Sequence, residues 1–433
     1  MKRRPSPDAL SEGSSKHIKQ VHPFFNKRAP GEASTIAIDG PSAQFKWLKN
    51  LGEKQTCLHG TNLTPPSRPR VAAFDLDGTL IDSPFGHATT AEWKWWRSMV
   101  PGKLKELHDL GYSIVIVTNQ LVKSRTITIW KQRVSSIAVA LPDVPFHIFA
   151  AIARDQYRKP MPGIWYELEN IFRQDGIEIG TRHPMNKSSS FFVGDAAGRQ
   201  PDHASTDRKW AINAGVQFHT PEEYFLKLAI NTNFVLPGFS VHSLPNLPLF
   251  TPTSSPLLPH SKDKSKEIIL FVGFPCLGKS SLYERYFAPA NYVHVNQDTL
   301  KTRPRCEAAA RDALVRRSSC VVDNTNASRY TRQFYVDIAK EYNVPIRCFH
   351  FTGSLDLAWH NNLYRALNQP PSLAASKPKR ELIPYAAFAT YQKNFEEPTL
   401  DEGFSEIKKI NWVFEGTDEE RRYWSMWLQT DGK

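Results

Sequence analysis

The sequence has few cysteines and no long apolar run. Its five cysteines are scattered over 433 residues and none has CxxC spacing, which argues against a disulfide framework and favours a reducing compartment. The most apolar stretch, residues 137–153, is interrupted by two prolines, an aspartate and a histidine, so no membrane-spanning helix is expected. The first residues, MKRRPSPDALSEGSS, lack the apolar core of a secretory signal. We therefore expect no membrane partner.

Acidic residues are fewer than basic ones, and the resulting positive charge indicates which kind of partner to expect. The 55 lysines and arginines exceed the 43 aspartates and glutamates, and the net charge is +12 with a pI of about 9.3. A strongly basic surface favours an anionic partner, first of all nucleic acid, because phosphates bind Lys and Arg. A basic surface that only aids solubility is the alternative. The length suffices for two or three domains.

Residues 1–45 are rich in Ser, Pro, Lys and Arg and lack apolar periodicity, so we predict a disordered basic tail. Its basic residues at positions 2–4, 16 and 19 have the character of a nuclear localisation signal, and the nucleus is the expected compartment. A short apolar pattern in the tail has the spacing of a sliding-clamp-binding peptide, formed by Ile18, Val21, Phe24 and Phe25. A small hydrophobic cluster that docks on the protein's own surface would have the same pattern.

Two blocks of α/β alternation follow the tail. In residues 46–235 and again in residues 267–433, short apolar runs that end in polar turns alternate with amphipathic helical patterns. This order predicts two doubly wound parallel-sheet domains of the α/β class. A stretch rich in Pro and Ser, residues 236–266, is predicted to be the linker between them. The capping-box spacing of Thr89 and Glu92 predicts a helix that begins within TTAEWKWW.

The second block opens with a glycine-rich loop between a predicted strand and a predicted helix. Its sequence GFPCLGKSS follows the P-loop pattern, in which backbone N–H groups surround phosphates and the helix N-terminus adds its dipole. Lys279 is expected to reach the β- and γ-phosphates of a nucleotide, and Ser280 to bind Mg²⁺. The predicted nucleotide-binding residues of the loop are Gly273, Gly278, Lys279, Ser280 and Ser281. A chance match in an ordinary strand–turn–helix is the alternative.

Three further side chains in this block suit phosphoryl transfer. Asp298 follows the next predicted strand, where a carboxylate can take a proton from an attacking hydroxyl. Asp323 ends the apolar run CVVD, close to the expected Mg²⁺ and nucleotide. Arg365 lies on a predicted helix, from which it can stabilise the transferring phosphoryl group. The structural alternatives are a helix N-cap for either aspartate and a surface position for the arginine.

The first block carries two carboxylates at the end of a buried strand. Asp75 and Asp77 in FDLDGT are two residues apart, so their side chains point the same way on an extended chain. Because like charges repel, the pair needs a cation or a catalytic reason. Mg²⁺ supplies the first. The second is covalent catalysis, in which one aspartate attacks phosphorus and the other handles the proton of the leaving group.

Four more polar residues follow in this block, each at a predicted strand end or in a loop. Thr118 offers a hydroxyl to a phosphate oxygen, and Lys159 can neutralise an aspartyl-phosphate. Asp195 can anchor Mg²⁺, with Asp207 as a second support. Each residue alone would suit a structural role, but ligands gather at the carboxyl ends of the strands in such sheets. The predicted metal ligands of both blocks are Asp75, Asp77, Asp195 and Ser280.

Together these motifs resemble the bifunctional polynucleotide kinase 3′-phosphatases over roughly residues 68–415. The first block is similar to haloacid-dehalogenase-type (HAD-like) phosphatases through FDLDGTLI, VTNQ, YRKPMPG and FFVGDAAGR. The second block resembles the P-loop kinase part of the family through GFPCLGKSS, YVHVNQDTL, DNTN and RCFHFTGSLDLAWHNN. The resemblance implies an enzyme that removes 3′-phosphates from broken nucleic-acid ends and phosphorylates their 5′-hydroxyls, with Mg²⁺ and ATP. DNA ends are the expected substrate, and a monomer is the expected state.

The same resemblance implies a role for each motif residue. It assigns the phosphatase nucleophile to Asp75, the acid–base role to Asp77 and the kinase base to Asp298. The other site residues keep the roles given above. In this family the phosphatase precedes the kinase in eukaryotes, which is also the order of the two blocks here.

The sequence departs from the family in three places. The tail is too short for the forkhead-associated domain of the animal enzymes, so recruitment through phosphorylated scaffold proteins is not expected. The phosphate loop holds Cys276 and Leu277 where small residues are usual. Gln297 replaces the arginine expected just before the kinase base, which weakens one expected contact to a phosphate.

A tryptophan cluster follows the aspartate pair closely. Trp93, Trp95 and Trp96 fall within four residues of one another. An aromatic side chain in this position can stack on an unpaired base near the broken end. The alternative is that the three rings pack a cap element, because tryptophans usually serve packing.

Three other functions compete with the resemblance. The first is a kinase joined to a phosphatase of small molecules such as sugars, which the positive charge disfavours. The second is a DNA-end-binding scaffold with decayed sites, which the intact charged residues of both sites disfavour. The third is an enzyme that processes RNA ends.

Overall fold

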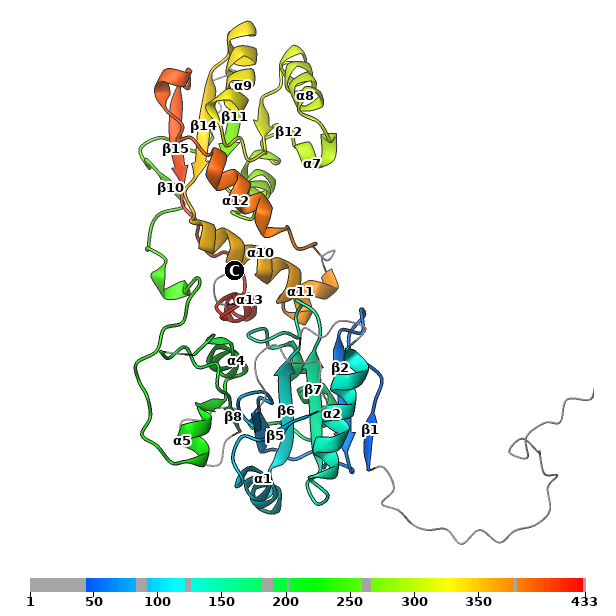
Figure 1. The fold of residues 1–433 in the computed structure, drawn as a ribbon. Helices are drawn as coiled ribbons and strands as arrows, with labels where there is room; N and C mark the ends of the chain where they lie inside the picture. Colours follow the sequence, from blue (N-terminus) through cyan, green and yellow to red (C-terminus); the bar gives the residue numbers. More distant parts are fainter. Residues whose placement is uncertain are drawn as a thin grey trace, which may run out of the picture. The chain divides into compact units, whose positions relative to one another are not determined.

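The computed structural model describes residues 44–82, 92–120, 126–180, 190–200, 202–258, 266–376 and 380–430. They belong to one unit, Ala43–Lys433, built on two large sheets and a small two-stranded one (Figure 1). The predicted localisation signal and the clamp-binding pattern of residues 18–25 lie outside the described residues, so both stay predictions. No helix in the described part of the chain is long and apolar enough to cross a membrane.

The first sheet has seven strands in the order β1-β2-β7-β6-β3-β8-β9. Their bounds are Phe45–Trp47 (β1), Cys57–Asn62 (β2), Val71–Phe74 (β3), Ser113–Asn119 (β6), Phe146–Ala151 (β7), Phe191–Val193 (β8) and Gln217–His219 (β9). The strands from β7 to β9 are parallel, as predicted. At the other edge β1 pairs with β2, and β2 with β7, in antiparallel fashion. The predicted parallel sheet therefore carries an additional antiparallel edge that the sequence did not indicate.

This antiparallel edge forms although its sequence is partly polar. Every residue of β2 is buried, including His59. Gly60 leaves space for the Phe45 ring, which would lie 2.7 Å from a Cβ at that position. Long-range packing, and not a local apolar run, therefore holds β1 and β2 in the sheet.

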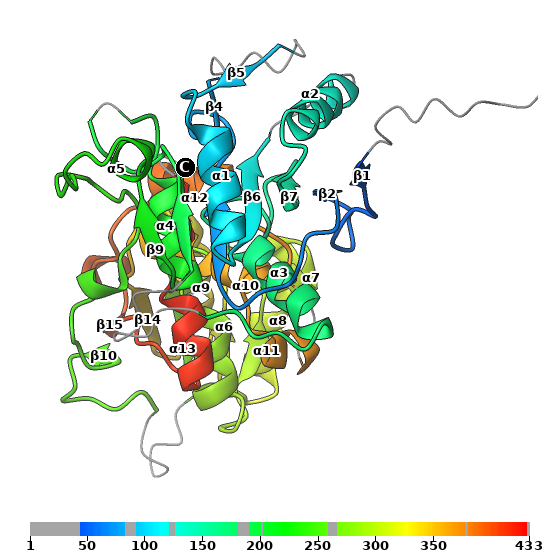
Figure 2. The same ribbon diagram turned by 90° about the horizontal axis from the view of Figure 1, so that it is seen from below.

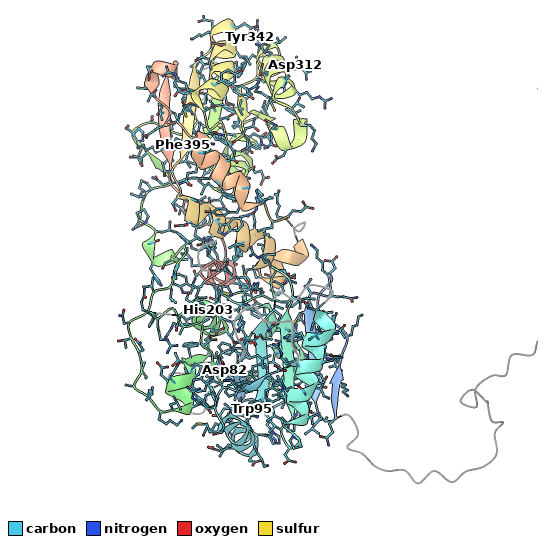
Figure 3. All side chains as sticks on the ribbon, viewed as in Figure 1. Asp82, Trp95, His203, Asp312, Tyr342 and Phe395 are labelled. Atoms are coloured by element: carbon cyan, nitrogen blue, oxygen red, sulfur yellow. The ribbon has the colours of Figure 1, made fainter. Side chains whose placement is uncertain are left out.

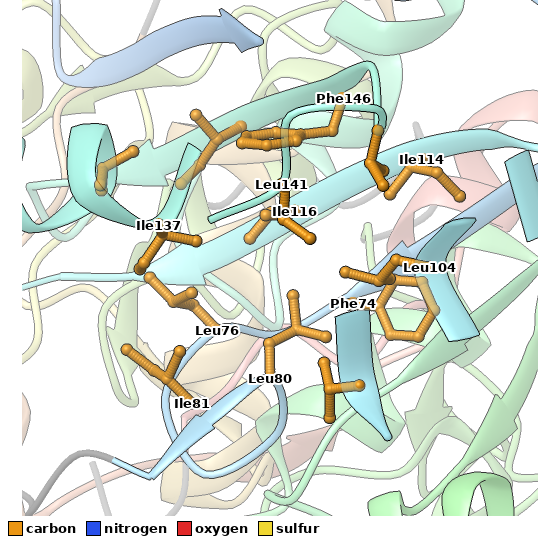
Figure 4. Packing of buried hydrophobic residues seen from close by; sticks show 14 of the residues in the cluster. Phe74, Leu76, Leu80, Ile81, Leu104, Ile114, Ile116, Ile137, Leu141 and Phe146 are labelled. Atoms are coloured by element: carbon orange, nitrogen blue, oxygen red, sulfur yellow. The ribbon is translucent and has the colours of Figure 1, made fainter. Parts of the chain in front are cut away.

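Helices cover both faces of the first sheet. They are α1 (Val100–Asp109), α2 (Ile127–Val139), α3 (Gly163–Gln174), α4 (Thr206–Ala214) and α5 (Pro221–Phe225). Because alternate strand residues point to opposite faces, Ile114 and Ile116 of β6 pack with α1 and α2, whereas Val115 and Val117 pack with α3 and α4. Figure 4 shows the first of these clusters, and Figure 2 shows α1 beside β6.

The helix predicted at TTAEWKWW does not form in the described residues. Thr89 itself lies outside them, and residues 94 and 95 form the short strand β5 (Lys94–Trp95), which pairs with β4 (Ile81–Asp82). Trp93 and Trp95 pack edge to face with ring centroids 4.8 Å apart, and the Trp96 N–H donates to the Leu80 carbonyl. Tertiary pairing outweighs the local capping signal here. Asp82 and Trp95 are labelled in Figure 3.

The second sheet has six strands in the order β10-β15-β14-β11-β13-β12. Their bounds are Phe250–Thr251 (β10), Ile268–Val272 (β11), Val293–Val295 (β12), Cys320–Val322 (β13), Ile346–Phe351 (β14) and Glu406–Ile410 (β15). All pairs are parallel except β10 with β15. The prediction of two α/β domains with mainly parallel sheets is confirmed.

The helical elements of this second domain pack against both faces of its sheet. The α-helices are α6 (Lys279–Leu282), α7 (Gln297–Leu300), α8 (Arg303–Val315), α9 (Arg329–Glu341), α10 (Leu355–Leu367), α11 (Pro371–Ser376), α12 (Tyr385–Asn394) and α13 (Asp418–Trp424). Short 3₁₀ or π turns are η2 (Val241–Ser243), η3 (Tyr283–Phe287) and η4 (Leu400–Glu402). The buried side chains of α8 and α9 form one core, and those of α10, α12 and α13 form another.

The predicted linker contributes to the second sheet through β10. The buried Lys408 ammonium of β15 donates to the carbonyls of Pro252 and Ser255 at 3.1 and 2.9 Å. Residues 250–255 are thereby fixed on the second domain. The segment is therefore part of the domain surface over this stretch.

Two candidate active sites

The fold brings the predicted residues of the first block to one edge of its sheet. Asp75 follows β3, Thr118 lies in β6, Asp195 follows β8, and Asp207 lies on α4. The Asp75 N–H donates to the Val193 carbonyl at 2.9 Å, so the nucleophile candidate is fixed between neighbouring parallel strands. This is the carboxyl edge of the sheet, where ligands of such folds bind.

Lys159 is the centre of this site. Its ammonium nitrogen lies 2.5 Å from Asp75 Oδ1, 2.8 Å from Asp207 Oδ1 and 3.0 Å from the Val117 carbonyl. The side chain is only 2% exposed. Burial lowers the pKa of Lys159, but the carboxylates of Asp207 and Asp75 outweigh this effect and raise the pKa to about 12. The lysine is therefore a permanent buried cation.

Three carboxylates crowd around this lysine. Oxygens of Asp75, Asp195 and Asp207 all lie within 4.8 Å of one another. Burial, followed by the charge of Asp207, raises the pKa of Asp195 to about 7. Burial also raises the pKa of Asp75, and both neighbouring carboxylates add to this effect. One lysine does not balance three carboxylates, so the set suits a divalent cation such as Mg²⁺, which prefers oxygen ligands.

The carboxylate group of this domain differs in one residue from the predicted metal ligands. Asp207, expected only as a second support, belongs to the carboxylate group, whereas Asp77 does not. The Asp77 carboxylate instead accepts a hydrogen bond from Gln120 Nε2 at 2.6 Å, and the same nitrogen donates to Thr118 Oγ1 at 3.0 Å. Asp77 is half-buried beside the site, a position that suits an acid–base group.

Sequence reasoning missed two residues of the motif VTNQ. Asn119 holds the backbone of Lys159 on both sides, because its Oδ1 accepts from the Lys159 N–H at 2.8 Å and its Nδ2 donates to the Lys159 carbonyl at 3.0 Å. Gln120 links Asp77 to Thr118. The only signal was the motif itself, since 40 residues separate Asn119 from Lys159.

Gly78 is required by the position of Asp195. Its backbone has φ +79°, which favours glycine, and a Cβ there would lie 2.6 Å from Asp195 Oδ2. The Asp195 carboxylate therefore packs directly on the turn that follows the DxD pair.

The structure places Trp93 against the first core. Its indole N–H donates to Ser136 Oγ of α2 at 2.6 Å, and Trp93, Trp95 and Trp96 are half-buried against the same cluster. This arrangement supports packing of the cap element as the role of the three rings.

In the second domain, the phosphate loop lies between β11 and α6. A Cβ at Gly273 would lie 2.7 Å from the Phe351 Cβ, so no side chain fits there. Gly278 has φ +84° at the start of α6. Lys279 Nζ donates to the carbonyls of Gly273 and Phe274 at 3.0 and 2.5 Å. Burial lowers the pKa of Lys279 to about 8 despite the nearby carboxylates.

Ser280 and Asp323 meet next to this lysine. The Ser280 hydroxyl donates to Asp323 Oδ2 at 2.6 Å, and His294 Nε2 and Asn296 Nδ2 lie 3.0 and 3.2 Å from the same oxygen. Burial raises the pKa of Asp323, but the hydrogen bonds from His294 and Ser280 outweigh it and hold the pKa below its usual value. The hydroxyl and the carboxylate form the oxygen pair that a Mg²⁺ site at a P-loop needs.

The helix-cap alternative is wrong for both aspartates of this domain. The N-cap of α7 is Asn296, whose Oδ1 accepts from the Asp298 N–H at 2.8 Å, and the N-cap of α9 is Ser328. The Asp298 side chain is exposed in the first turn of α7 and raises the pKa of Lys279 through its charge.

Arg365 lies near the phosphate loop that contains Cys276. Arg365 of α10 is half-buried, and its charge lowers the pKa of both Lys279 and Cys276. It also lines a cavity of about 310 Å³ together with Tyr157, Tyr166 and other residues of the first domain. Asn361 of α10 donates to the Cys276 carbonyl at 3.0 Å. The unusual residue Cys276 is therefore accommodated by the helix that carries Arg365.

Of the remaining candidates, Gln297 and Ser281 are both exposed near the loop. The Gln297 N–H donates to Asn324 Oδ1 at 2.8 Å, which fixes its backbone next to Asp298. Ser281 follows Ser280 on α6. Neither side chain has a role that the geometry determines.

Comparison with known proteins gives family matches in both domains. The family "Polynucleotide kinase 3 phosphatase" matches residues 70–225, and an "AAA domain" family matches residues 301–398. The bifunctional polynucleotide phosphatase/kinase of Schizosaccharomyces pombe is 37% identical over 364 residues, which cover 82% of this chain and 83% of that protein. The chain belongs to the bifunctional polynucleotide phosphatase/kinase family.

Two further relatives support this membership. A putative bifunctional polynucleotide phosphatase/kinase of Acanthamoeba polyphaga mimivirus is 32% identical over 383 residues, covering 80% of this chain and 85% of its own. The Polynucleotide 3′-phosphatase ZDP of Arabidopsis thaliana is 35% identical over 177 residues, which cover 36% of this chain and 24% of that protein. Membership of the phosphatase/kinase family does not favour any of the three competing functions.

Proposed function

We propose that this chain repairs broken DNA ends by removing the 3′-phosphate and by transferring the γ-phosphoryl group of ATP to the 5′-hydroxyl. The observation that carries the proposal is the presence, in one chain, of two phosphate-handling sites of opposite chemistry. One is the Lys159–Asp75–Asp207 cluster with Asp195, and the other is the phosphate loop with the Ser280–Asp323 pair. The family membership supplies the polynucleotide substrate.

In the phosphatase, the Asp75 carboxylate attacks phosphorus and the Lys159 ammonium, 2.5 Å away, balances the charge of the resulting aspartyl-phosphate. Asp77, oriented by Gln120, gives a proton to the leaving 3′-oxygen and then takes one from the water that hydrolyses the intermediate. The Thr118 hydroxyl binds a phosphate oxygen. Asp75, Asp195 and Asp207 would hold Mg²⁺, which supplies positive charge beside the phosphate.

In the kinase, Asp298 accepts the proton of the attacking 5′-hydroxyl, for which its exposed position on α7 is suited. Lys279 moves from the loop carbonyls to the β- and γ-phosphates, and Arg365 stabilises the transferring group from α10. The backbone of Gly273 and Gly278 surrounds the phosphates of ATP. Ser280 and Asp323 would hold Mg²⁺, which would supply positive charge beside the phosphates.

The test uses the purified chain and two oligonucleotides, one with a 3′-phosphate and one with a 5′-hydroxyl. The 3′-phosphorylated oligonucleotide should release inorganic phosphate without ATP. The oligonucleotide with a 5′-hydroxyl should become labelled only when γ-labelled ATP is present. Excess chelator should abolish both activities, because each site needs a divalent cation. Sugar phosphates and sugars should not replace the oligonucleotides. Turnover of the small molecules alone would contradict the proposal.

The nuclear location and the clamp-binding pattern Ile18–Phe25 are separate proposals about the tail. A pull-down with the sliding clamp tests the second, using Phe24→Ala with Phe25→Ala as the altered chain. Binding by the wild-type chain and its loss in the variant would support it. Both catalytic activities should stay intact in that variant, because the tail contributes none of the site residues.

The monomeric state is proposed as well, and light scattering tests it.

A further inference from the structure

Residues 423–430, at the end of α13 and beyond it, belong to the second domain in sequence but contact the first. Asn213 of α4 brackets the backbone of Trp427, because its Oδ1 accepts from the Trp427 N–H at 2.8 Å and its Nδ2 donates to the Trp427 carbonyl at 2.7 Å. The same Nδ2 donates to the Pro160 carbonyl at 2.8 Å. One amide therefore joins the C-terminal segment to the residue that follows Lys159.

The loop that carries Lys159 also packs on the second domain through Met161, two residues further along the chain. Met161 is 4% exposed and lies in one cluster with Leu363 of α10 and Leu428 of the C-terminal segment. On the neighbouring helix α3, the ring of Tyr166 lies 5.6 Å from that of Tyr423. The loop that delivers the buried lysine thus rests on side chains of the other domain.

The helix that carries Asp207 is held by the same segment. Lys209, fully buried on α4, donates to the carbonyls of Gln429 and Pro237 at 3.1 and 2.6 Å. Gln429 is in turn fixed to the second domain, because its Nε2 donates to the Asp356 carbonyl at 2.7 Å. Lys209 and Asn213 are four residues apart, so both face the C-terminal segment from one side of the helix.

From these contacts we infer that the C-terminal segment, residues 423–430, positions the phosphatase site. Lys159 must keep contacts of 2.5 and 2.8 Å to two carboxylates that come from different elements. The segment fixes both the loop of Lys159 and the helix of Asp207, and Asn213 is the positioning residue that links the two. The inference rests on the proposed phosphatase activity. It makes the kinase domain a structural part of the phosphatase site.

The test compares the full chain with two variants at Asn213. Asn213→Ala removes all three hydrogen bonds, and Asn213→Asp keeps the size and the acceptor but removes both donations. Asn170→Ala, an exposed asparagine on α3, is the matched control. The readouts are the specificity constant, kcat/KM, for hydrolysis of the phosphorylated oligonucleotide, the inhibition constant of orthovanadate, kinase activity and thermal unfolding. Orthovanadate mimics the phosphoryl group in transfer, and its inhibition constant does not depend on the fraction of folded enzyme.

We expect this specificity constant to fall roughly ten- to hundred-fold in both variants, as for the loss of other groups that orient site residues. The inhibition constant of orthovanadate should rise by a similar factor, while kinase activity and the control variant stay close to wild type. An unchanged specificity constant in a folded variant would overturn the inference. A lower kcat with an unchanged inhibition constant of orthovanadate would also overturn the inference, because this pattern reports only a loss of folded protein. A wild-type chain without phosphatase activity would instead overturn the proposed function.

Discussion

At the scale of single residues, the phosphatase site depends on one cation among several carboxylates. Lys159 is buried with Asp75 and Asp207, and Asp195 completes the group. That these residues lie together could be predicted from their types at strand ends and in loops. The contacts of Asn119 and Gln120 could not, because they involve the backbone of Lys159 and the side chain of Asp77, which only the fold brings near.

Removal of the buried cation should destabilise the fold as well as the chemistry. Lys159→Met keeps the length of the side chain but leaves Asp75 and Asp207 without their counter-charge. Breaking a buried ion pair in this way costs about 3–5 kcal/mol, so we expect a loss of that order in the free energy of unfolding, measured with denaturant. Added Mg²⁺ should restore part of it. Lys103→Met, which removes a partly exposed pair with Glu106, is the control; equal losses in both variants would contradict the account.

A second prediction concerns the glycine after the DxD pair. In Gly78→Ala the new Cβ would lie 2.6 Å from Asp195 Oδ2, so Asp195 must move. We expect phosphatase activity to fall roughly ten-fold or more and the Mg²⁺ concentration for half-maximal activity to rise. Gly176→Ala has a similar φ, +76°, but nothing within 4 Å of the new Cβ. Gly176→Ala should cost about 1 kcal/mol of stability and leave the Mg²⁺ requirement unchanged. An equal rise of the half-maximal Mg²⁺ concentration in Gly176→Ala would argue against the role of Asp195.

At the scale of elements, the sequence predicted those strands whose buried residues form a contiguous apolar run. Strands β3, β6, β11 and β14 are buried on both faces by helices, so their sequences carry the signal themselves. Strand β2, with His59, Gly60 and Asn62, carries no such signal, and distant pairing with β7 holds it in place. The helix expected from Thr89 failed for the converse reason, since a local cap motif does not outweigh strand pairing.

The β2–β7 pair gives a prediction for the dependence of stability on pH. His59 Nε2 and His147 Nδ1 lie 3.1 Å apart in the buried edge of the sheet. Burial lowers the pKa of His59 to about 4 and that of His147 to about 3. The unfolded chain, with an ordinary histidine pKa of about 6.5, binds more protons below that pH. Stability should therefore be full above pH 6.5 and fall as the pH drops toward 4.

His147→Gln should flatten this dependence, because it removes one of the buried histidines whose pKa is lowered in the folded chain. The measurement is the unfolding temperature of wild type and variant between pH 4.5 and pH 8, reported as a slope. His242→Gln, at an exposed histidine, is the control and should keep the wild-type slope. The same slope in all three chains would show that the buried pair does not govern acid stability.

At the scale of the whole molecule, the two sets of predicted site residues lie on two sheets of one chain. The separation of the sets could be predicted, because each motif lies within its own block of the sequence. The contact between Asn213 and Trp427 could not, because 214 residues separate them and neither belongs to a motif. The two domains therefore share structural contacts while their catalytic groups stay separate.

The central claim is tested most directly with one oligonucleotide that carries a 3′-phosphate at one end and a 5′-hydroxyl at the other. Asp75→Asn keeps the size of the side chain but removes the nucleophile, so 3′-phosphate release should fall by orders of magnitude. Phosphorylation of the 5′-end should continue at nearly the wild-type rate. Lys279→Ala should do the reverse, because the γ-phosphoryl group loses its main counter-charge. Loss of both activities in a folded Asp75→Asn chain would contradict the presence of two separate active sites.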